Sequence, residues 1–305
     1  MKRMLFFTSL FLFFMSLNAK ASSYFTLHID NDLLYGTDRD YTGGFKFKFT
    51  DNELTLNQKL IEPFDPIIKS LGLTLISDQL EMSIEAFTLG KKGPSSKVDL
   101  LLNEAWTHVD LRRFYKRTSQ QVAIDMSFGW LGPNSPGKSA QNKLHQLIGN
   151  DLVEGARYHL PDQLTFMVGA DIMTDLFSIE DWQFYQSSWL KLGSPQTQGF
   201  LGIGVIRSVN SDPVLKNNQV NYVRLDSKGM GYFYFGSIGM SYLWYSALVD
   251  GRLLALDDPL LPRYRWIPMV QYGAGVSFEK IAITLSGNAI GKIYKDQPEN
   301  VFRFA

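Results

Sequence analysis

The sequence predicts an all-β fold, a transmembrane antiparallel β-barrel of about twelve strands with short helical insertions in loops. Many segments of about ten residues place an apolar or aromatic side chain at every second position, which is the period of a strand. Aromatic residues make up 14% of the chain, as expected if rings gather at two membrane interfaces. After the N-terminal segment, no stretch reaches the roughly 18 consecutive apolar residues of a membrane-spanning helix.

The composition excludes several functional classes. The chain has 305 residues with 30 lysines and arginines against 30 acidic residues, so no basic excess favours nucleic-acid binding. A hydrophobic fraction of 45% argues against intrinsic disorder. Because cysteine is absent, disulfides, thiolate metal sites and cysteine nucleophiles are excluded. Nothing in the sequence implies an oligomer.

Residues 1–21 have the pattern of a cleaved signal peptide. Two basic residues precede an apolar run from Met4 to Leu17, and Ala19-Lys20-Ala21 is a small-residue cleavage motif. The run is too short to cross a membrane comfortably, which disfavours an anchor. We therefore expect an exported protein with a signal peptide, residues 1–21, and one barrel domain, residues 22–305.

The predicted strands follow one another along the mature chain. In the segment GGFKFKFT, three phenylalanines alternate with Lys46 and Lys48, the pattern expected of a lipid-facing wall around a polar lumen. The last two predicted segments are long enough to contain further hairpin boundaries. The predicted strands are roughly 23–33, 42–52, 79–90, 99–110, 119–131, 163–175, 180–192, 196–207, 218–227, 231–248, 264–278 and 280–304.

Two stretches interrupt the strand pattern. Residues 53–78 contain Pro63 and Pro66 and predict a loop with a short helix. Residues 132–161 predict the clearest helical insertion, because Ser139 is a suitable N-cap and Gly149 a natural end. A soluble β-sandwich or an inert porin-like barrel with decorated loops is the alternative to this assignment.

An acidic cluster lies between the first two predicted strands. Four carboxylates and Asn31 occur within eleven residues. Hard oxygen ligands grouped in this way suit Ca²⁺ or Mg²⁺, although the spacing is not that of an EF-hand. A polar hairpin turn with solvated acids is the alternative. The four carboxylates belong to Asp30, Asp32, Asp38 and Asp40.

The pleat of the first strand assigns two faces. If Leu27 and Ile29 face lipid, then His28, Asp30 and Asp32 share the lumen side.

The helical insertion carries the best candidate for acid–base chemistry. Gln141 and His145 are four residues apart and therefore share a helix face, and Asp151 follows the predicted helix end. The chain has no G-x-S-x-G motif that would present a serine nucleophile. Three other histidines lack comparable neighbours and are expected to be structural: His28, His108 and His159.

A basic pair, Lys91-Lys92, ends a predicted strand. Such a pair can bind the phosphate of a lipid headgroup, or it can be an ordinary loop charge pair.

Together these segments resemble the outer-membrane lipid A 3'-O-deacylase family. The order and spacing of the matching pieces agree, and the resemblance covers most of the chain. It implies a barrel in the outer membrane of a Gram-negative bacterium, with its active site near the outer leaflet. It also implies a Ca²⁺-dependent hydrolase that removes the 3'-linked acyloxyacyl group from lipid A of lipopolysaccharide. The matching pieces are a signal peptide, Asn31-Asp32, Asp40-Tyr41-Thr42-x-Gly44, Gly132-Pro133 and Gln141-x-x-x-His145-x-x-Ile148-Gly149.

By position, the resemblance implies a role for each matching residue. His145 is the general base that activates water, and Asp151 stands where the family has Glu; Asp151 or Asn31 can orient the imidazole. Lys91 and Lys92 fall where a basic pair meets a lipid A phosphate. Other functional positions are Asn31, Asp32, Thr42 and Gln141, and the candidate Ca²⁺ ligands are Asp32, Thr42 and Gly44.

One segment departs from the family pattern. Many relatives carry D-R-P-Y-A-G-W between the second and third matching pieces, whereas this chain has WTHVDLRRFYKR. The substrate is therefore less well defined than the fold. Two alternatives remain at this point: an outer-membrane phospholipase A-like esterase with a serine nucleophile, and a non-enzymatic barrel or pore. A dozen strands leave little room for a wide channel.

Overall fold

A computed structural model describes most of the chain. The predicted signal peptide lies outside the described residues. No helix within the described part of the chain is both long and apolar enough to cross a membrane. The described residues are 23–31, 43–51, 60–92, 98–137, 160–216, 219–224, 229–251, 261–278, 281–295, 297 and 301–304.

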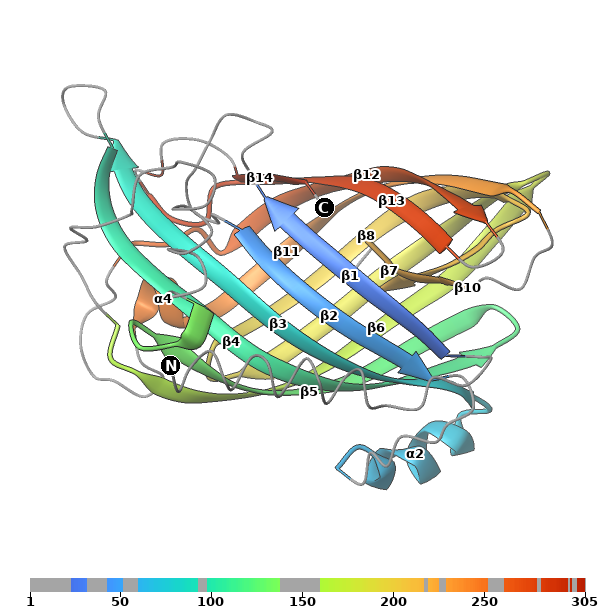
Figure 1. The fold of residues 1–305 in the computed structure, drawn as a ribbon, viewed down its shortest axis with the longest axis horizontal. Helices are drawn as coiled ribbons and strands as arrows, with labels where there is room; N and C mark the ends of the chain where they lie inside the picture. The colour runs from blue at the N-terminus through green and yellow to red at the C-terminus, as the bar shows by residue number, and fades with distance from the viewer. Residues whose placement is uncertain are drawn as a thin grey trace.

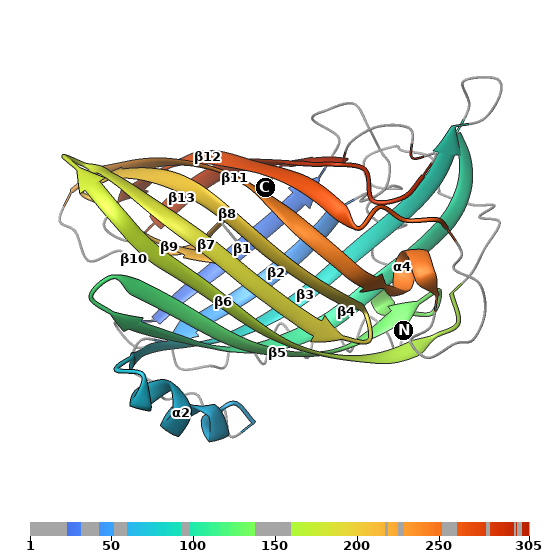
Figure 2. The same cartoon turned by 180° about the vertical axis from the view of Figure 1, so that it is seen from behind.

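Twelve of the described strands form a closed antiparallel barrel (Figures 1 and 2), which confirms the predicted fold class. Neighbours in the wall are neighbours in chain order, and β1 closes the barrel against β14, where Asn31 lies opposite Phe304. The wall strands are β1 (Ser23–Asn31), β2 (Gly43–Asp51), β3 (Thr74–Lys92), β4 (Val98–Arg117), β5 (Gln120–Gly132), β6 (Gln163–Ile179), β7 (Trp182–Gly193), β8 (Gln196–Val209), β11 (Gly231–Ser246), β12 (Trp266–Phe278), β13 (Ile281–Ile290) and β14 (Val301–Phe304).

The alternation of side chains sorts the wall into two faces. On β1, Leu27 and Ile29 are at least half exposed on the outside, whereas Asp30 is buried on the lumen side. This confirms the faces predicted from the pleat. Exposed apolar side chains recur on the other strands, so the outer surface of the barrel is suited to lipid.

Exposed aromatic side chains gather near both ends of the barrel. The end of the barrel where β1 joins β2 and β5 joins β6 is here called the loop end, and the end where β6 joins β7 in the Ile179–Trp182 turn is called the turn end. Rings at both ends are expected where the wall meets the two membrane interfaces. At the loop end the exposed rings include Trp130, Trp244 and Trp266, and at the turn end they include Phe177, Tyr232 and Phe278.

A hairpin inside the barrel corrects one sequence prediction. Residues 218–227 were expected to form a wall strand, but β9 (Asp212–Lys216) and β10 (Gln219–Arg224) pair only with each other. The predicted strand 280–304 instead contains two wall strands, β13 and β14. The predicted strand number is right because these two errors cancel. A period of two does not distinguish a wall strand from a strand within the lumen.

The hairpin packs against opposite sides of the wall. Leu215, Val220 and Val223 form an apolar cluster with side chains of β7, β8 and β11. On the other side, Lys216 Nζ lies 2.7 Å from Asp125 of β5, and Lys48 of β2 donates a 3.0 Å hydrogen bond to Asn221. The hairpin therefore occupies the lumen as a plug connected to the turn end.

The described helices are short. The predicted helix within residues 53–78 is confirmed as a 3-10 turn, η2 (Glu62–Phe64), followed by α2 (Asp65–Ser70). β3 then begins at Thr74, earlier than predicted. At the loop end, α4 (Ala247–Asp250) follows β11. Most of the predicted helical insertion, residues 138–159, lies outside the described residues.

Candidate active site at the loop end

The loop end brings several sequence-predicted positions onto neighbouring strands (Figure 1). Asn31 ends β1 and pairs with Gly43 of β2. The next residue of β2, Gly44, pairs with Asp30 of β1 on one side and with Glu85 of β3 on the other. The pair Lys91-Lys92 ends β3. The remaining predicted site residues lie outside the described residues: Asp32, Thr42, Gln141, His145 and Asp151.

The segment predicted as a helical insertion starts on the outer wall of the barrel. Trp106 and His108 of β4 face the lumen, so Thr107 between them faces outward. Its hydroxyl lies 2.9 Å from the Ser135 hydroxyl and accepts a 3.1 Å hydrogen bond from the Gly137 backbone N–H. A Cβ at Gly137 would lie only 2.9 Å from side-chain atoms of Ile84 and Ala105. This close approach to β3 and β4 requires glycine.

The insertion ends over the mouth of the lumen. The Leu160 backbone N–H donates a 3.2 Å hydrogen bond to Glu104 of β4, and the Leu160 side chain is buried in an apolar cluster with Leu89 and Leu102. The described ends of the insertion therefore lie on the lipid-facing wall, at Gly137, and at the lumen mouth, at Leu160.

Asp162 joins the two ends of the insertion. Its carboxylate accepts hydrogen bonds from the Asn134 backbone N–H at 3.0 Å, the Asn134 amide at 2.6 Å and the Trp130 indole at 3.1 Å. Gly132 adopts a φ of +140°, and a Cβ there would lie 2.7 Å from the same carboxylate. The Gly132-Pro133 piece of the resemblance therefore has a structural role, since it allows the Asp162 contact.

We expect Asp162→Ala to accelerate tryptic cleavage after Lys138 and Lys143 by about tenfold, which corresponds to 1.4 kcal/mol. Hydrogen bonds to a charged acceptor each contribute about 1.5–3 kcal/mol, so their loss loosens the ends of the insertion. Time-resolved limited proteolysis checks this. Asp181→Ala, which removes an exposed acid at the turn end, is the matched control and should cleave at the wild-type rate. Equal rates for both variants would show that Asp162 does not hold the insertion.

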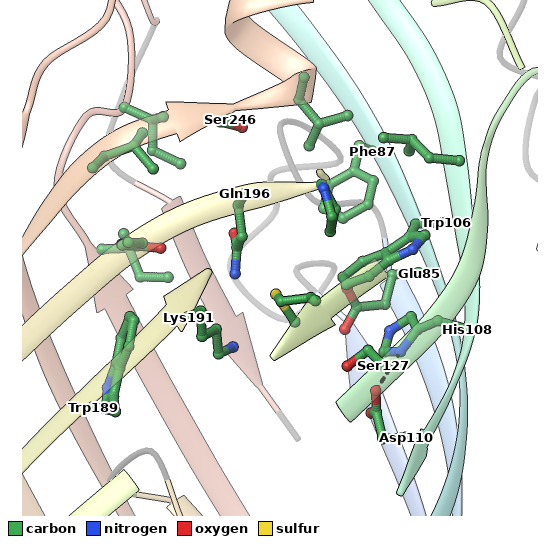
Figure 3. Close-up of a pocket in the computed structure, with 18 of the residues that line it drawn as sticks. Glu85, Phe87, Trp106, His108, Asp110, Ser127, Trp189, Lys191, Gln196 and Ser246 are labelled. Carbon is green, nitrogen blue, oxygen red and sulfur yellow. Dashed lines mark hydrogen bonds and ion pairs between the residues drawn. The ribbon is translucent and has the colours of Figure 1, made fainter. Parts of the chain in front are cut away.

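A cavity of about 280 Å³ lies in the lumen below the loop end (Figure 3). His108 lines it, with Nδ1 3.0 Å from the Asp110 carboxylate and its ring stacked on Trp106 at 3.8 Å between centroids. Lys46 of β2 bridges the carboxylates of Glu85, at 3.1 Å, and Asp30, at 3.5 Å. Deeper in the lumen, Arg112 pairs with Glu81 at 3.0 Å. Charged groups in this low-dielectric interior are thus mostly paired, as burial requires.

Sequence reasoning did not select the lumen residues as functional candidates. His108 was expected to be structural because single histidines usually are. Its alternation with Asp110 and Arg112 on one strand was the available signal, because such residues share the lumen face.

Around the predicted Ca²⁺ site, the structure describes the strand pairing of β1 and β2 and the side chain of Asp30. Among them, no three histidine or acidic side chains gather as metal ligands. The carboxylate of Asp30 is engaged by His28 at 2.8 Å and by Lys46. Asn31 and Gly43, the chain neighbours of Asp32 and Thr42, are paired across β1 and β2. Of the three predicted ligands, Gly44 alone lies within the described residues.

Comparisons with known proteins identify the family. A family model described as "Outer membrane protein LpxR" matches residues 5–305. The solved structure "LpxR from Salmonella typhimurium" is similar in fold, with a TM-score of 0.72 and 16% sequence identity over 93% of this chain and 97% of that one. No curated protein sequence matches significantly. Because the family match spans nearly the whole chain, this protein belongs to the LpxR family of outer membrane proteins.

Proposed function

We propose that this protein is a lipid A deacylase that removes the 3'-linked acyloxyacyl group by hydrolysing its ester. The observation that carries the proposal is family membership over residues 5–305. The described ends of the insertion support it, because Gly137 contacts Thr107 on the lipid-facing wall and Leu160 contacts Glu104 at the lumen mouth.

His145 is proposed as the general base. An imidazole accepts a proton from water near neutral pH, and the resulting hydroxide attacks the ester carbonyl. The ester C–O bond then breaks, the sugar oxygen takes the proton back from His145, and the acid and the sugar hydroxyl separate. Gln141 shares the helix face predicted for His145, and Asp151 or Asn31 orients the imidazole.

Asp32, Thr42 and the backbone of Gly44 are proposed to hold Ca²⁺. When bound, the ion supplies a positive charge for the ester oxygen that becomes negative during hydrolysis. Lys91 and Lys92 are proposed to bind a phosphate of lipid A. At the loop end, β3 continues from Ala86, the partner of Gly43, to Lys92, so the two lysines lie beyond the start of β2 and pair with β4.

The N-terminal segment is proposed to be a signal peptide that is removed on export, as expected for an outer-membrane barrel.

Calcium removal tests the proposed metal. We expect purified full-length protein in detergent to deacylate lipid A with Ca²⁺ present and to lose at least about 100-fold of that rate with EDTA, a loss typical of removing one element of oxyanion stabilisation. Excess Ca²⁺ should restore the rate, and Mg²⁺ should restore it poorly because it demands a tighter octahedral site. Mass spectrometry of the lipid measures both. An EDTA-insensitive rate would contradict the calcium assignment and leave the deacylase proposal standing.

A further inference from the structure

We propose that the lumen cavity binds a long-chain carboxylic acid, with its carboxylate between His108 and Lys191 and its hydrocarbon chain directed toward the loop end. The site deepens the proposed function and rests on it in one respect, because ester hydrolysis releases such an acid. A free fatty acid of the outer leaflet has the same chemistry.

The lining of the cavity suits an amphiphile that enters from the loop end. Its lining near the loop end combines apolar side chains of several wall strands and α4 with the polar side chains of Gln196 and Ser246. Lys216 of the β9–β10 hairpin contributes to the deep part of the lining, so the plug obstructs the turn end. A ligand therefore enters from the loop end, where the insertion lies. The apolar lining includes Phe87, Leu89, Leu131, Met167, Leu248 and Val249.

Polar groups in the cavity lack partners among the described residues. His108 Nε2 and the Ser127 hydroxyl are both buried and neither forms a hydrogen bond there. Asp110 and Trp106 fix the His108 ring, so Nε2 cannot turn away to find a partner. A buried polar group without a partner costs about 1–3 kcal/mol, which a bound ligand would recover.

Among the described residues that line the cavity, Lys191 is the cation left for an anionic ligand. The other cations of the cavity lining are already paired with acids: Lys46 with Glu85, Arg112 with Glu81 and Lys216 with Asp125. Among the described residues, Lys191 forms no ion pair and lies 5.4 Å from the ring centroid of Trp189. Figure 3 shows Lys191 and His108 on opposite sides of the cavity.

A carboxylate matches this set of groups. The Lys191 ammonium only donates hydrogen bonds, and His108, when protonated, donates through Nε2 as well as to Asp110. The Ser127 hydroxyl adds a third donor. An anion with two acceptor oxygens satisfies these donors, and its alkyl chain then fills the apolar part of the cavity. A neutral alcohol of equal length leaves the positive charge of Lys191 unpaired.

Photolabelling tests the site with a defined probe. Full-length protein in lipid nanodiscs is irradiated with a diazirine-bearing dodecanoate, and labelled peptides are mapped by mass spectrometry. We expect labels on peptides that contain Phe87 and Met167, and at least about tenfold stronger competition by dodecanoate than by dodecanol. Labels confined to the lipid-facing wall, or equal competition by the two compounds, would overturn the proposal.

Matched variants separate the site from general effects. Lys191→Met and His108→Gln should each reduce cavity labelling by about tenfold, a 1.4 kcal/mol loss of binding, whereas Lys191→Arg should retain most of it. Lys69→Met, in α2 outside the lumen, should label like the wild type. Heat-dependent gel mobility confirms that each barrel is folded. Wild-type labelling in folded Lys191→Met and His108→Gln proteins would refute the site.

Deacylation is measured in parallel with labelling. Binding of dodecanoate without any deacylation would refute the proposed function and leave the site supported. Deacylation without cavity labelling would refute the binding site and leave the proposed function supported.

Discussion

His145→Ala is expected to reduce lipid A deacylation by about 10²–10⁴-fold, the contribution of a general base to a proton transfer. The insertion that carries His145 is not required for closure of the barrel, since β5 and β6 pair directly from Leu131 and Gln163 onward. The variant should therefore fold like the wild type. The rate of release of the acyloxyacyl acid, followed by mass spectrometry, measures the loss.

His159→Ala is the matched control, because it removes a second imidazole from the same insertion without a proposed role. Its rate should be within about twofold of the wild type, as for a residue without transition-state contacts. A near wild-type rate for His145→Ala, or an equal loss for His159→Ala, would contradict the assignment of the base.

Lys216→Met is expected to destabilise the folded plug by about 3–5 kcal/mol, because it leaves the buried carboxylate of Asp125 without its 2.7 Å partner. Arg224→Met is the matched control in the same hairpin. It breaks a 3.3 Å pair with Asp212, a residue whose side chain is 60% exposed, and exposed pairs contribute about 0–1 kcal/mol.

Two measurements check the plug. Urea unfolding should show a larger loss of the free energy of unfolding for Lys216→Met than for Arg224→Met. Planar-bilayer recordings should show brief openings for Lys216→Met but not for the wild type or Arg224→Met. A steady open conductance of the wild type would instead support a passive pore.

The fold class could be predicted from the sequence because alternation is a local property. Leu27 and Ile29 outside and Asp30 inside follow from the pleat alone. The plug could not be predicted in this way. Val220 and Tyr222 alternate with polar residues as a wall strand would, and only the contacts of Val220 and Val223 with β7, β8 and β11 place the segment in the lumen.

The candidate site residues stay predictions. Among those that the structure describes, Asn31, Gly44 and Lys91-Lys92 lie on three adjacent strands, toward the loop end. The outward start of the insertion depends on Gly137 meeting Thr107, and this contact between distant parts of the chain has no local signature. The proposed roles of His145, Asp32 and Thr42 stay predictions.

The lipid A mass spectrum of a Gram-negative host with unmodified lipid A tests the central claim most directly. Expression of the wild-type protein should convert lipid A to a species lacking one acyloxyacyl group, and expression of His145→Ala should leave lipid A intact at equal barrel abundance. Intact lipid A in cells that contain folded wild-type protein and Ca²⁺ would contradict the proposed deacylase activity.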